Sequence, residues 1–300
     1  STYACRRMVQ LEGFEPGAWL AAARAEKVSN AFLVPTMLAR IVEHLDASGE
    51  PPALPALKAL AYGGGKMPLS TIERAIALLP HVDFTNAYGL TETSSTVCVL
   101  GPDDHRAAAS SEDPAIRRRL ASVGQATGAV EIQIRDEDDR VLGAEDAGLV
   151  FVRGGQVSGE YLEKGSLLDA DGWFPTRDRG YLDADGYLFL DGRADDVIVR
   201  GGENISPGEI EDVLLGHEAV ADVAVVAVPD EQWGEGVAAA VVLKPQASAS
   251  VEELQALVRQ QLRSSRVPQT IVFRDELPYN ELGKVLRRVI RQELSEAVAA

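Results

Sequence analysis

Helical and strand-like patterns alternate along the first hundred residues of the chain. Apolar positions at helical spacing give way to short apolar runs bounded by glycine, proline or charged residues. The helical patterns cover residues 16–27, 36–45 and 70–79, and the strand patterns cover 28–34, 57–62 and 82–86. Strands that alternate with helices predict a parallel or mixed sheet covered by helices. Residues 1–115 are therefore expected to form part of an α/β domain.

Between residues 116 and 192 the pattern changes to short strands separated by glycine and aspartate turns. The acidic runs at 136–139 and 183–186 are typical of hairpin turns. This segment is expected to be a small antiparallel sheet or a β-barrel-like subdomain.

The last part of the chain, residues 193–300, has an α+β pattern. Pro207 suits a first helical position, and Ser206 and Glu209 have the spacing of a capping box. We expect helices at 207–215, 251–263 and 284–294, and strands at 220–228, 236–243 and 270–273. The whole chain is thus expected to combine α/β and α+β parts, with boundaries near residues 115 and 192.

Composition favours a globular protein with real cores, since 46% of the residues are hydrophobic and 25% are charged. The formal net charge of −17 argues against a nucleic-acid partner, which would require a basic surface. Cys5 and Cys98 show no pairing or metal-ligand spacing, which favours a reducing, cytoplasmic location. No apolar run approaches the ~20 residues that a membrane helix needs. The oligomeric state is left open.

A glycine triplet, Gly63, Gly64 and Gly65, follows the second strand pattern and invites comparison with a phosphate-binding loop. The Walker A pattern does not fit, because Met67 stands where that motif needs serine or threonine after its lysine. On these residues alone, a turn that needs the backbone freedom of glycine is the simpler explanation.

The octapeptide at 86–93, Asn-Ala-Tyr-Gly-Leu-Thr-Glu-Thr, follows a strand pattern and contains several side chains that could bind a ligand. Open α/β sheets bind ligands at the carboxyl ends of their strands. Tyr88 offers an aromatic face for a base, Thr91 a hydroxyl for a phosphate oxygen, and Glu92 a carboxylate suited to Mg²⁺. By composition alone, a polar turn explains the octapeptide equally well.

Together with its neighbours, the octapeptide resembles the signature of the adenylate-forming superfamily, which includes acyl-CoA synthetases, luciferases and peptide-synthetase adenylation domains. Further segments resemble the motifs of that family in the same order: 62–68 (YGGGKMP), 172–178 (GWFPTRD), 191–211 and 277–284 (LPYNELGK). The resemblance covers about residues 11–291. The run at 200–207 (RGGENISP) is more similar to acyl- or aryl-CoA synthetases than to peptide-synthetase domains.

The resemblance implies a nucleotide site. Tyr88 would stack on adenine, Thr91 would bond the α-phosphate, and Glu92 would bind Mg²⁺. The nucleotide-binding residues that it implies are Gly63, Gly64, Gly65, Asn86, Ala87, Tyr88, Gly89, Thr91, Asp178 and Arg193.

The resemblance also implies residues for the two reaction steps. Lys284 would be catalytic together with Thr91 and Glu92, because its charge would lie between the attacking carboxylate and the α-phosphate. Asp195 matches the hinge about which the C-terminal domain of the family turns. The CoA-binding residues would be Gly201, Gly202 and Trp233, although a tryptophan at the edge of a core explains Trp233 equally well.

The implied activity is that of an ATP-dependent ligase that joins a fatty or aryl carboxylic acid to CoA through an acyl-AMP intermediate. ATP, Mg²⁺, CoA and the small acid would be its partners. Two alternatives stay open: a non-catalytic nucleotide- or acyl-AMP-binding remnant, and an adenylation domain that loads a carrier protein. The Ser/Thr/Gly-rich phosphate loop of the family has no counterpart here, so we expect the C-terminal portion of a longer ligase.

Overall fold

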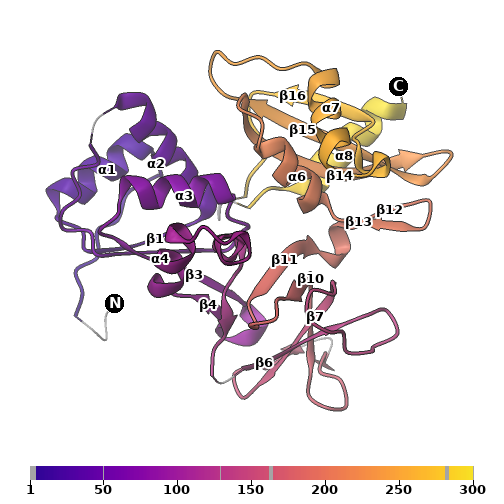
Figure 1. Cartoon of the computed structure of the whole chain (residues 1–300), viewed down its shortest axis with the longest axis horizontal. Coiled ribbons are helices and arrows are strands. Elements are labelled where there is room, and N and C mark those ends of the chain that lie inside the picture. Colours follow the sequence, from indigo (N-terminus) through magenta and orange to yellow (C-terminus); the bar gives the residue numbers. More distant parts are fainter. Residues whose placement is uncertain (1–4, 50, 129, 162–164, 281–283, 300) are drawn as a thin grey trace. The chain divides into compact units, whose positions relative to one another are not determined.

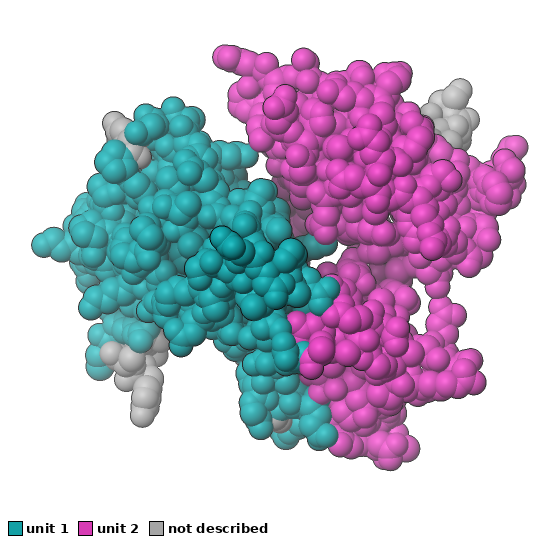
Figure 2. Space-filling view, viewed as in Figure 1, with its two compact units in different colours: residues 1–131, 154–166, 185–189 teal, residues 132–153, 167–184, 190–300 magenta. Residues whose placement is uncertain are grey.

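A computed structural model of the chain describes residues 5–49, 51–128, 130–161, 165–280 and 284–299. The chain divides into two compact units, coloured separately in Figure 2. The first comprises Ser1–Glu131, Gly154–Ser166 and Asp185–Phe189, and the second Ile132–Arg153, Leu167–Ala184 and Leu190–Ala300. The three-part division at residues 115 and 192 stays a prediction. No helix among the described residues has the length and apolar character needed to cross a bilayer.

A mixed five-stranded sheet forms the centre of the first unit, as the alternation of elements predicts. The first three strands run parallel, and the last two continue the sheet in antiparallel pairs. Their order is β1 (Asn30–Leu33), β2 (Ala59–Gly63), β3 (Asp83–Leu90), β4 (Ser95–Leu100) and β5 (Gln125–Ala126).

Helix α2 (Pro35–Ser48) of the first unit buries one apolar stripe. In α2, Leu38, Ile41 and Leu45 are spaced by three and four residues and are all buried. Pro35 opens this helix, and Gly49 ends it in the left-handed conformation with a φ of 64°. The helical elements of this unit are α1 (Pro16–Ala25), α2 (Pro35–Ser48), α3 (Leu69–Leu78), η1 (Thr91–Thr93), α4 (Pro102–Ser110), α5 (Pro114–Arg117) and η2 (Arg118–Ala121) (Figure 1).

Two further sheets lie mostly in the second unit. The strand order β11-β10-β7-β6 has two ends among the described residues, so this is an open sheet and not a closed barrel. Its strands are β6 (Val130–Arg135), β7 (Gly148–Gly154), β10 (Phe174–Leu182) and β11 (Leu188–Arg193). The other sheet consists of β12 (Ile198–Arg200), β13 (Glu203–Ile205), β14 (Val220–Asp230), β15 (Gly234–Leu243) and β16 (Thr270–Arg274).

Helices cover both faces of this C-terminal sheet. On one face, Val225 and Ala239 pack with apolar residues of α6 (Pro207–Leu215) and α7 (Val251–Gln261). On the other, Ala224 and Ala238 pack with α8 (Arg287–Ala299). The two long strands are apolar on both faces because both faces are covered.

Two local predictions in this region are wrong. The hydroxyl of Ser206 does not cap α6 but donates to the backbone oxygen of Asp191 at 2.6 Å, while Glu209 pairs with Arg266 at 3.2 Å. Tertiary partners therefore replace the local capping box. The last helix begins at Arg287 rather than at Lys284, so Lys284 lies in the segment before it.

A buried polar pair joins the end of β2 to α4 in the first unit. The Nδ1 of His105 lies 2.8 Å from the carbonyl oxygen of Gly101, so this nitrogen carries the hydrogen. The Nε2 of His105 then accepts from the hydroxyl of Tyr62 at 2.9 Å. Burial lowers the pKa of His105 and raises the pKa of Tyr62, which keeps both side chains neutral. The pair fixes β2 at the residue before Gly63.

We expect acid to destabilise the first unit through His105. The unfolded chain binds a proton at the usual His pKa of about 6.5, whereas the folded chain resists it, so the stabilisation is fully present above that pH and is lost below it. Between about pH 7.5 and pH 5.5, the thermal midpoint should fall more steeply in the wild type than in His105→Gln, as measured by circular dichroism. Parallel pH profiles would contradict this assignment.

Candidate nucleotide and thioester sites

The glycine segment after β2 is fixed by the close approach of two strands. Gly63 pairs with Ala87 of β3, and a Cβ at Gly63 would lie 2.5 Å from the carbonyl oxygen of Ala87. Gly64 has a φ of 85°, which favours glycine. Gly64 and Gly65 are exposed. The backbone after β2 therefore carries no side chains at Gly64 and Gly65 and is exposed there. It lies beside β3, the strand that carries the signature octapeptide.

The octapeptide is a strand end and a turn rather than a loop that follows a strand. β3 extends to Leu90, and the next three residues form the single turn η1. Asn86 is buried and donates to the backbone oxygen of Ser122 at 3.2 Å, so its amide supports the chain. Tyr88 and Gly89 flank a register shift between β3 and β4. Thr91 is exposed and Glu92 is half-buried.

Residues outside the octapeptide hold this turn in place. The Nε2 of Gln156 donates to the backbone oxygens of Thr93 and Thr96, at 3.0 and 2.8 Å. The backbone N–H of Ser158 donates to the backbone oxygen of Glu92 at 2.9 Å. Sequence reasoning missed Gln156 and Ser158, because they lie more than sixty residues away in the chain.

Asp178 and Arg193, which come from different motifs, lie in contact in the second unit. The Nη1 of Arg193 is 3.0 Å from Oδ1 of Asp178 and 3.0 Å from the backbone oxygen of Thr176. Asp178 is 7% exposed, whereas the Arg193 side chain is about half exposed. An irregularity in β10 places the carboxylate, since the register with β7 shifts here and Arg177 has a φ of 64°.

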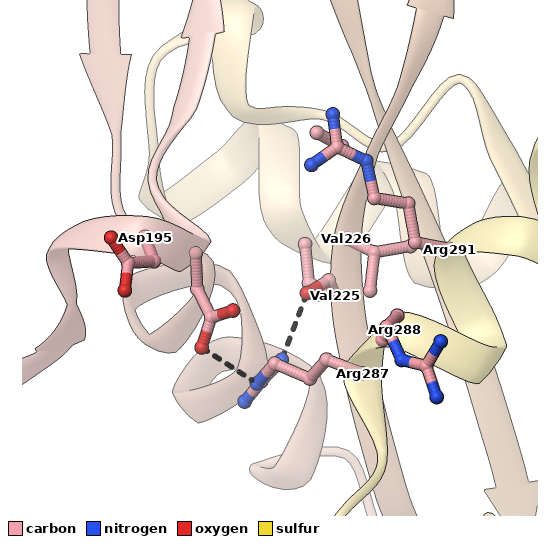
Figure 3. Close-up of a pocket in the computed structure, with 8 residues that line it drawn as sticks. Asp195, Val225, Val226, Arg287, Arg288 and Arg291 are labelled. Carbon is pink, nitrogen blue, oxygen red and sulfur yellow. Dashed lines mark hydrogen bonds and ion pairs between the residues drawn. The ribbon is translucent and has the colours of Figure 1, made fainter. Parts of the chain in front are cut away.

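The turn after β11 carries Asp195. This turn, η3 (Ala194–Asp196), leaves the Asp195 side chain 62% exposed and 3.4 Å from the guanidinium of Arg177. An exposed ion pair of this kind contributes little to stability. The turn also borders a hollow of about 190 Å³, to which Val225, Val226 and Arg291 contribute (Figure 3).

Gly201 and Trp233, both expected at the CoA site, also lie together. Gly201 and Gly202 form the tight turn between β12 and β13, with φ of 59° and 83°. The N–H of Gly201 donates to the backbone oxygen of Trp233 at 2.9 Å. Trp233 is 44% exposed, and Cζ of Arg200 lies 5.9 Å from the centroid of its ring. A partly open indole beside a bare glycine turn is a surface on which a flat ring can stack.

Lys284 is exposed and lies in the segment between β16 and α8. Its N–H donates to Oδ1 of Asn280 at 2.9 Å, and the N–H of Asn280 donates to the backbone oxygen of Lys284 at 2.9 Å. Residues 281–283 of the lysine motif lie outside the described residues.

The residues of η1 fit a magnesium ion that is held mainly by phosphates. No group of three or more His, Cys, Asp or Glu side chains with metal-binding geometry occurs in the described part of the chain. Mg²⁺ commonly takes one or two carboxylates and completes its shell with phosphate oxygens and water. The half-buried Glu92, on a turn fixed by Ser158, matches such a single-carboxylate site.

The profile of the AMP-binding enzyme family matches residues 4–162, and that of the AMP-binding enzyme C-terminal domain matches residues 209–284. The medium/long-chain-fatty-acid–CoA ligase FadD8 of Mycobacterium tuberculosis is 31% identical over 96% of this chain and 50% of its own length. The 2-succinylbenzoate–CoA ligase of Bacillus cereus is 34% identical over 88% of this chain and 52% of its own. The chain thus spans about half the length of the curated relatives it matches.

The amide bond synthetase McbA from Marinactinospora thermotolerans has a similar structure, with a TM-score of 0.83 at 32% identity. The superposition covers 95% of this chain and 56% of that one. Sequence and structure together place the chain in the adenylate-forming superfamily. The chain belongs to the AMP-binding enzyme family.

The contact between Gly201 and Trp233 predicts different outcomes for two neighbouring substitutions. Alanine at Gly201 or at Gly202 would adopt a left-handed backbone, at a cost of about 1–2 kcal/mol. Only at Gly201 would the new Cβ meet the indole, 2.7 Å from Cε3 of Trp233, while at Gly202 nothing lies within 4 Å. We therefore expect Gly201→Ala, and not Gly202→Ala, to change the emission of Trp233.

The measurement is the difference in tryptophan fluorescence between each variant and the same variant carrying Trp233→Phe. This subtraction removes Trp19 and Trp173, the other tryptophans of the sequence. Equal spectral changes in both alanine variants would contradict the contact.

Proposed function

We propose that the protein acts as an ATP-dependent carboxylic acid:CoA ligase with a fatty or aryl acid as substrate. In the first step, a carboxylate oxygen attacks the α-phosphorus of ATP, the bond to the β-phosphate breaks, and pyrophosphate leaves. In the second, the CoA sulfur attacks the carbonyl carbon of the acyl-AMP, and AMP leaves with the electrons of the C–O bond. Family membership supports the ligase class.

The contact between Asp178 and Arg193 carries the proposal. These residues belong to motifs that the resemblance assigns to one nucleotide, and they lie 3.0 Å apart. In this role the buried Asp178 carboxylate accepts hydrogen bonds from the ribose hydroxyls, as short carboxylates do in dinucleotide sites. Arg193 neutralises Asp178 and presents its remaining N–H groups to the ribose or phosphate oxygens.

Residues 63–65 and 88–92 are the other proposed nucleotide-binding segments. Tyr88 stacks on the adenine, the exposed hydroxyl of Thr91 bonds the α-phosphate, and the bare backbone at Gly64 and Gly65 lets the nucleotide and acyl group approach. When bound, Mg²⁺ on Glu92 would neutralise phosphate charge. Since η1 is fixed by hydrogen bonds from distant residues, these groups need little reordering when ATP binds.

Lys284 is the proposed catalytic residue of adenylation. Its ammonium is a compact charge on a long stem, suited to stabilise the negative charge that develops between carboxylate and α-phosphate. Asp195 is the proposed hinge. The turn at Gly201 and Gly202, together with Trp233, is the proposed surface for CoA. ATP and CoA as co-substrates agree with the cytoplasmic location that we infer from the sequence.

A second candidate differs only in the acceptor. The relative McbA is an amide bond synthetase, which favours testing acceptors other than CoA. We propose to express the protein from its complete reading frame and to offer the acyl-AMP with CoA, a carrier protein or an amine. Thioester formation with CoA supports the ligase. Transfer only to the carrier or the amine would assign the alternative, and nucleotide binding without any turnover would identify a remnant.

Lys284→Ala should separate the two steps. Loss of one charge that acts on the transition state typically costs about 10²–10³ in rate, so ATP–pyrophosphate exchange should fall by that factor. Thioester formation from supplied acyl-AMP should stay near the wild-type rate, because no α-phosphate is attacked in that step. The exposed Lys244 in the same unit provides the matched control, Lys244→Ala. Equal loss of both steps would refute the role of Lys284.

A further inference from the structure

The segment that carries Lys284 is closed by backbone pairing into a small stem. The N–H of Leu286 donates to the backbone oxygen of Pro278 at 2.8 Å, and Tyr279 forms an antiparallel bridge with Val285. The mutual hydrogen bonds of Asn280 and Lys284 complete the stem. We call residues 278–280 and 284–286 the lysine stem. Lys284 therefore stands at a defined position relative to two flanking residues, Tyr279 and Arg287.

Each side of the lysine stem is anchored to β14 through a carboxylate, which is the half-buried Asp222 on one side and the buried Glu211 on the other. On one side, the hydroxyl of Tyr279 donates to the carboxylate of Asp222, which also accepts from the N–H of Val223 at 2.9 Å. On the other, both terminal nitrogens of Arg287 contact Glu211, at 2.5 and 2.9 Å. A forked pair of this kind fixes orientation as well as distance.

Arg287 also binds the backbone of β14. Its Nη1 donates to the carbonyl oxygen of Val225 at 2.8 Å. The backbone N–H of Val225 donates to Oε1 of Glu211 at 2.7 Å. β14 is an edge strand of its sheet in the described residues, so these backbone groups have no neighbouring strand. Arg287 and Glu211 take the place of that strand.

Three carboxylates, those of Asp196, Glu211 and Asp222, act on the single positive charge of Arg287. Asp196 lies 3.6 Å from Nε of Arg287, and burial raises the pKa of both Asp196 and Asp222. Arg287 therefore faces three carboxylates, counting Glu211, and is their shared counter-charge. Arg288, the next residue, points the opposite way in Figure 3 and is exposed. This difference provides a control for charge at the start of α8.

We propose that Tyr279 and Arg287 are positioning residues that clamp the lysine stem to β14 and so fix the place from which Lys284 acts. The clamp itself is a property of the described contacts. Its effect on adenylation rests on the proposed function. Asp196 extends the clamp to the turn that carries Asp195, since the two residues are adjacent in η3.

Hydrogen exchange tests the clamp on the chain itself. Arg287→Lys keeps the charge but loses the fork, and Tyr279→Phe keeps the ring but loses the hydroxyl. Either variant should speed amide exchange at Asn280, Lys284 and Leu286 by about tenfold or more, while the β14–β15 ladder stays protected. Arg288→Lys should leave all of these amides unchanged.

Unchanged protection of the stem in both variants would overturn the clamp. So would an equal loss of protection in the β14–β15 ladder, since it would mean that the variants loosen the whole unit. If Arg287→Lys fails to fold, the outcome for Tyr279→Phe decides, because Asp222 keeps its bond to Val223 in that variant.

Half-reaction kinetics with the complete reading frame test the consequence for Lys284. Arg287→Lys and Tyr279→Phe should each slow ATP–pyrophosphate exchange by about tenfold or more, with thioester formation from acyl-AMP retained. A merely structural role would slow both steps together and would overturn the proposal. If the wild type forms no acyl-AMP, the proposed function fails, and hydrogen exchange alone decides on the clamp.

Discussion

The open edge of β14 is the constraint on which the second unit depends. This strand is buried on both faces, so unpaired backbone groups along its edge would be costly. At Val225 the carboxylate of Glu211 accepts from the N–H, and the guanidinium of Arg287 donates to the carbonyl oxygen. The Glu211 and Arg287 side chains are 10% and 27% exposed. Removing one partner of such a pair leaves a buried charge, at a typical cost of ~3–5 kcal/mol.

The pair of Glu211 and Arg287 also links α6 to the start of α8. Glu211 comes from α6 and Arg287 from the first turn of α8, so the pair joins the helices that cover opposite faces of the sheet. The lysine stem directly precedes Arg287 and is held on its other side by Tyr279. The contacts that satisfy the edge of β14 therefore also hold the lysine stem that carries Lys284. A long, flexible lysine side chain gains most from such a rigid base, because less freedom is lost when it acts.

Periodicity and motif order were sufficient to predict much of this fold. Helical spacing and short apolar runs located α1, α2, α3, α6 and α7, because each helix buries one stripe. They also located β1, β2, β3, β14, β15 and β16, whereas β4, β5 and β13 were not predicted. The errors lie where distant partners act. Ser206 has the local pattern of a cap, yet Asp191 takes its hydroxyl. The supports at Gln156 and Asp222 have no local signal, since each contacts a segment more than fifty residues away.

The candidate site residues stand beside backbone that only long-range contacts can hold in place. Ser94, at the end of η1, has a φ of 54°, and Arg177, beside Asp178, has a φ of 64°. For residues other than glycine such backbone is unfavourable, and it persists only where its surroundings fix it. The hydroxyl of Ser94 donates to the backbone oxygen of Gln156 at 2.9 Å, while Thr176, before Arg177, donates to Val150 at 2.8 Å. A local sequence pattern can identify the acidic and hydroxyl side chains of a candidate site, but the contacts that orient them form only in the folded chain.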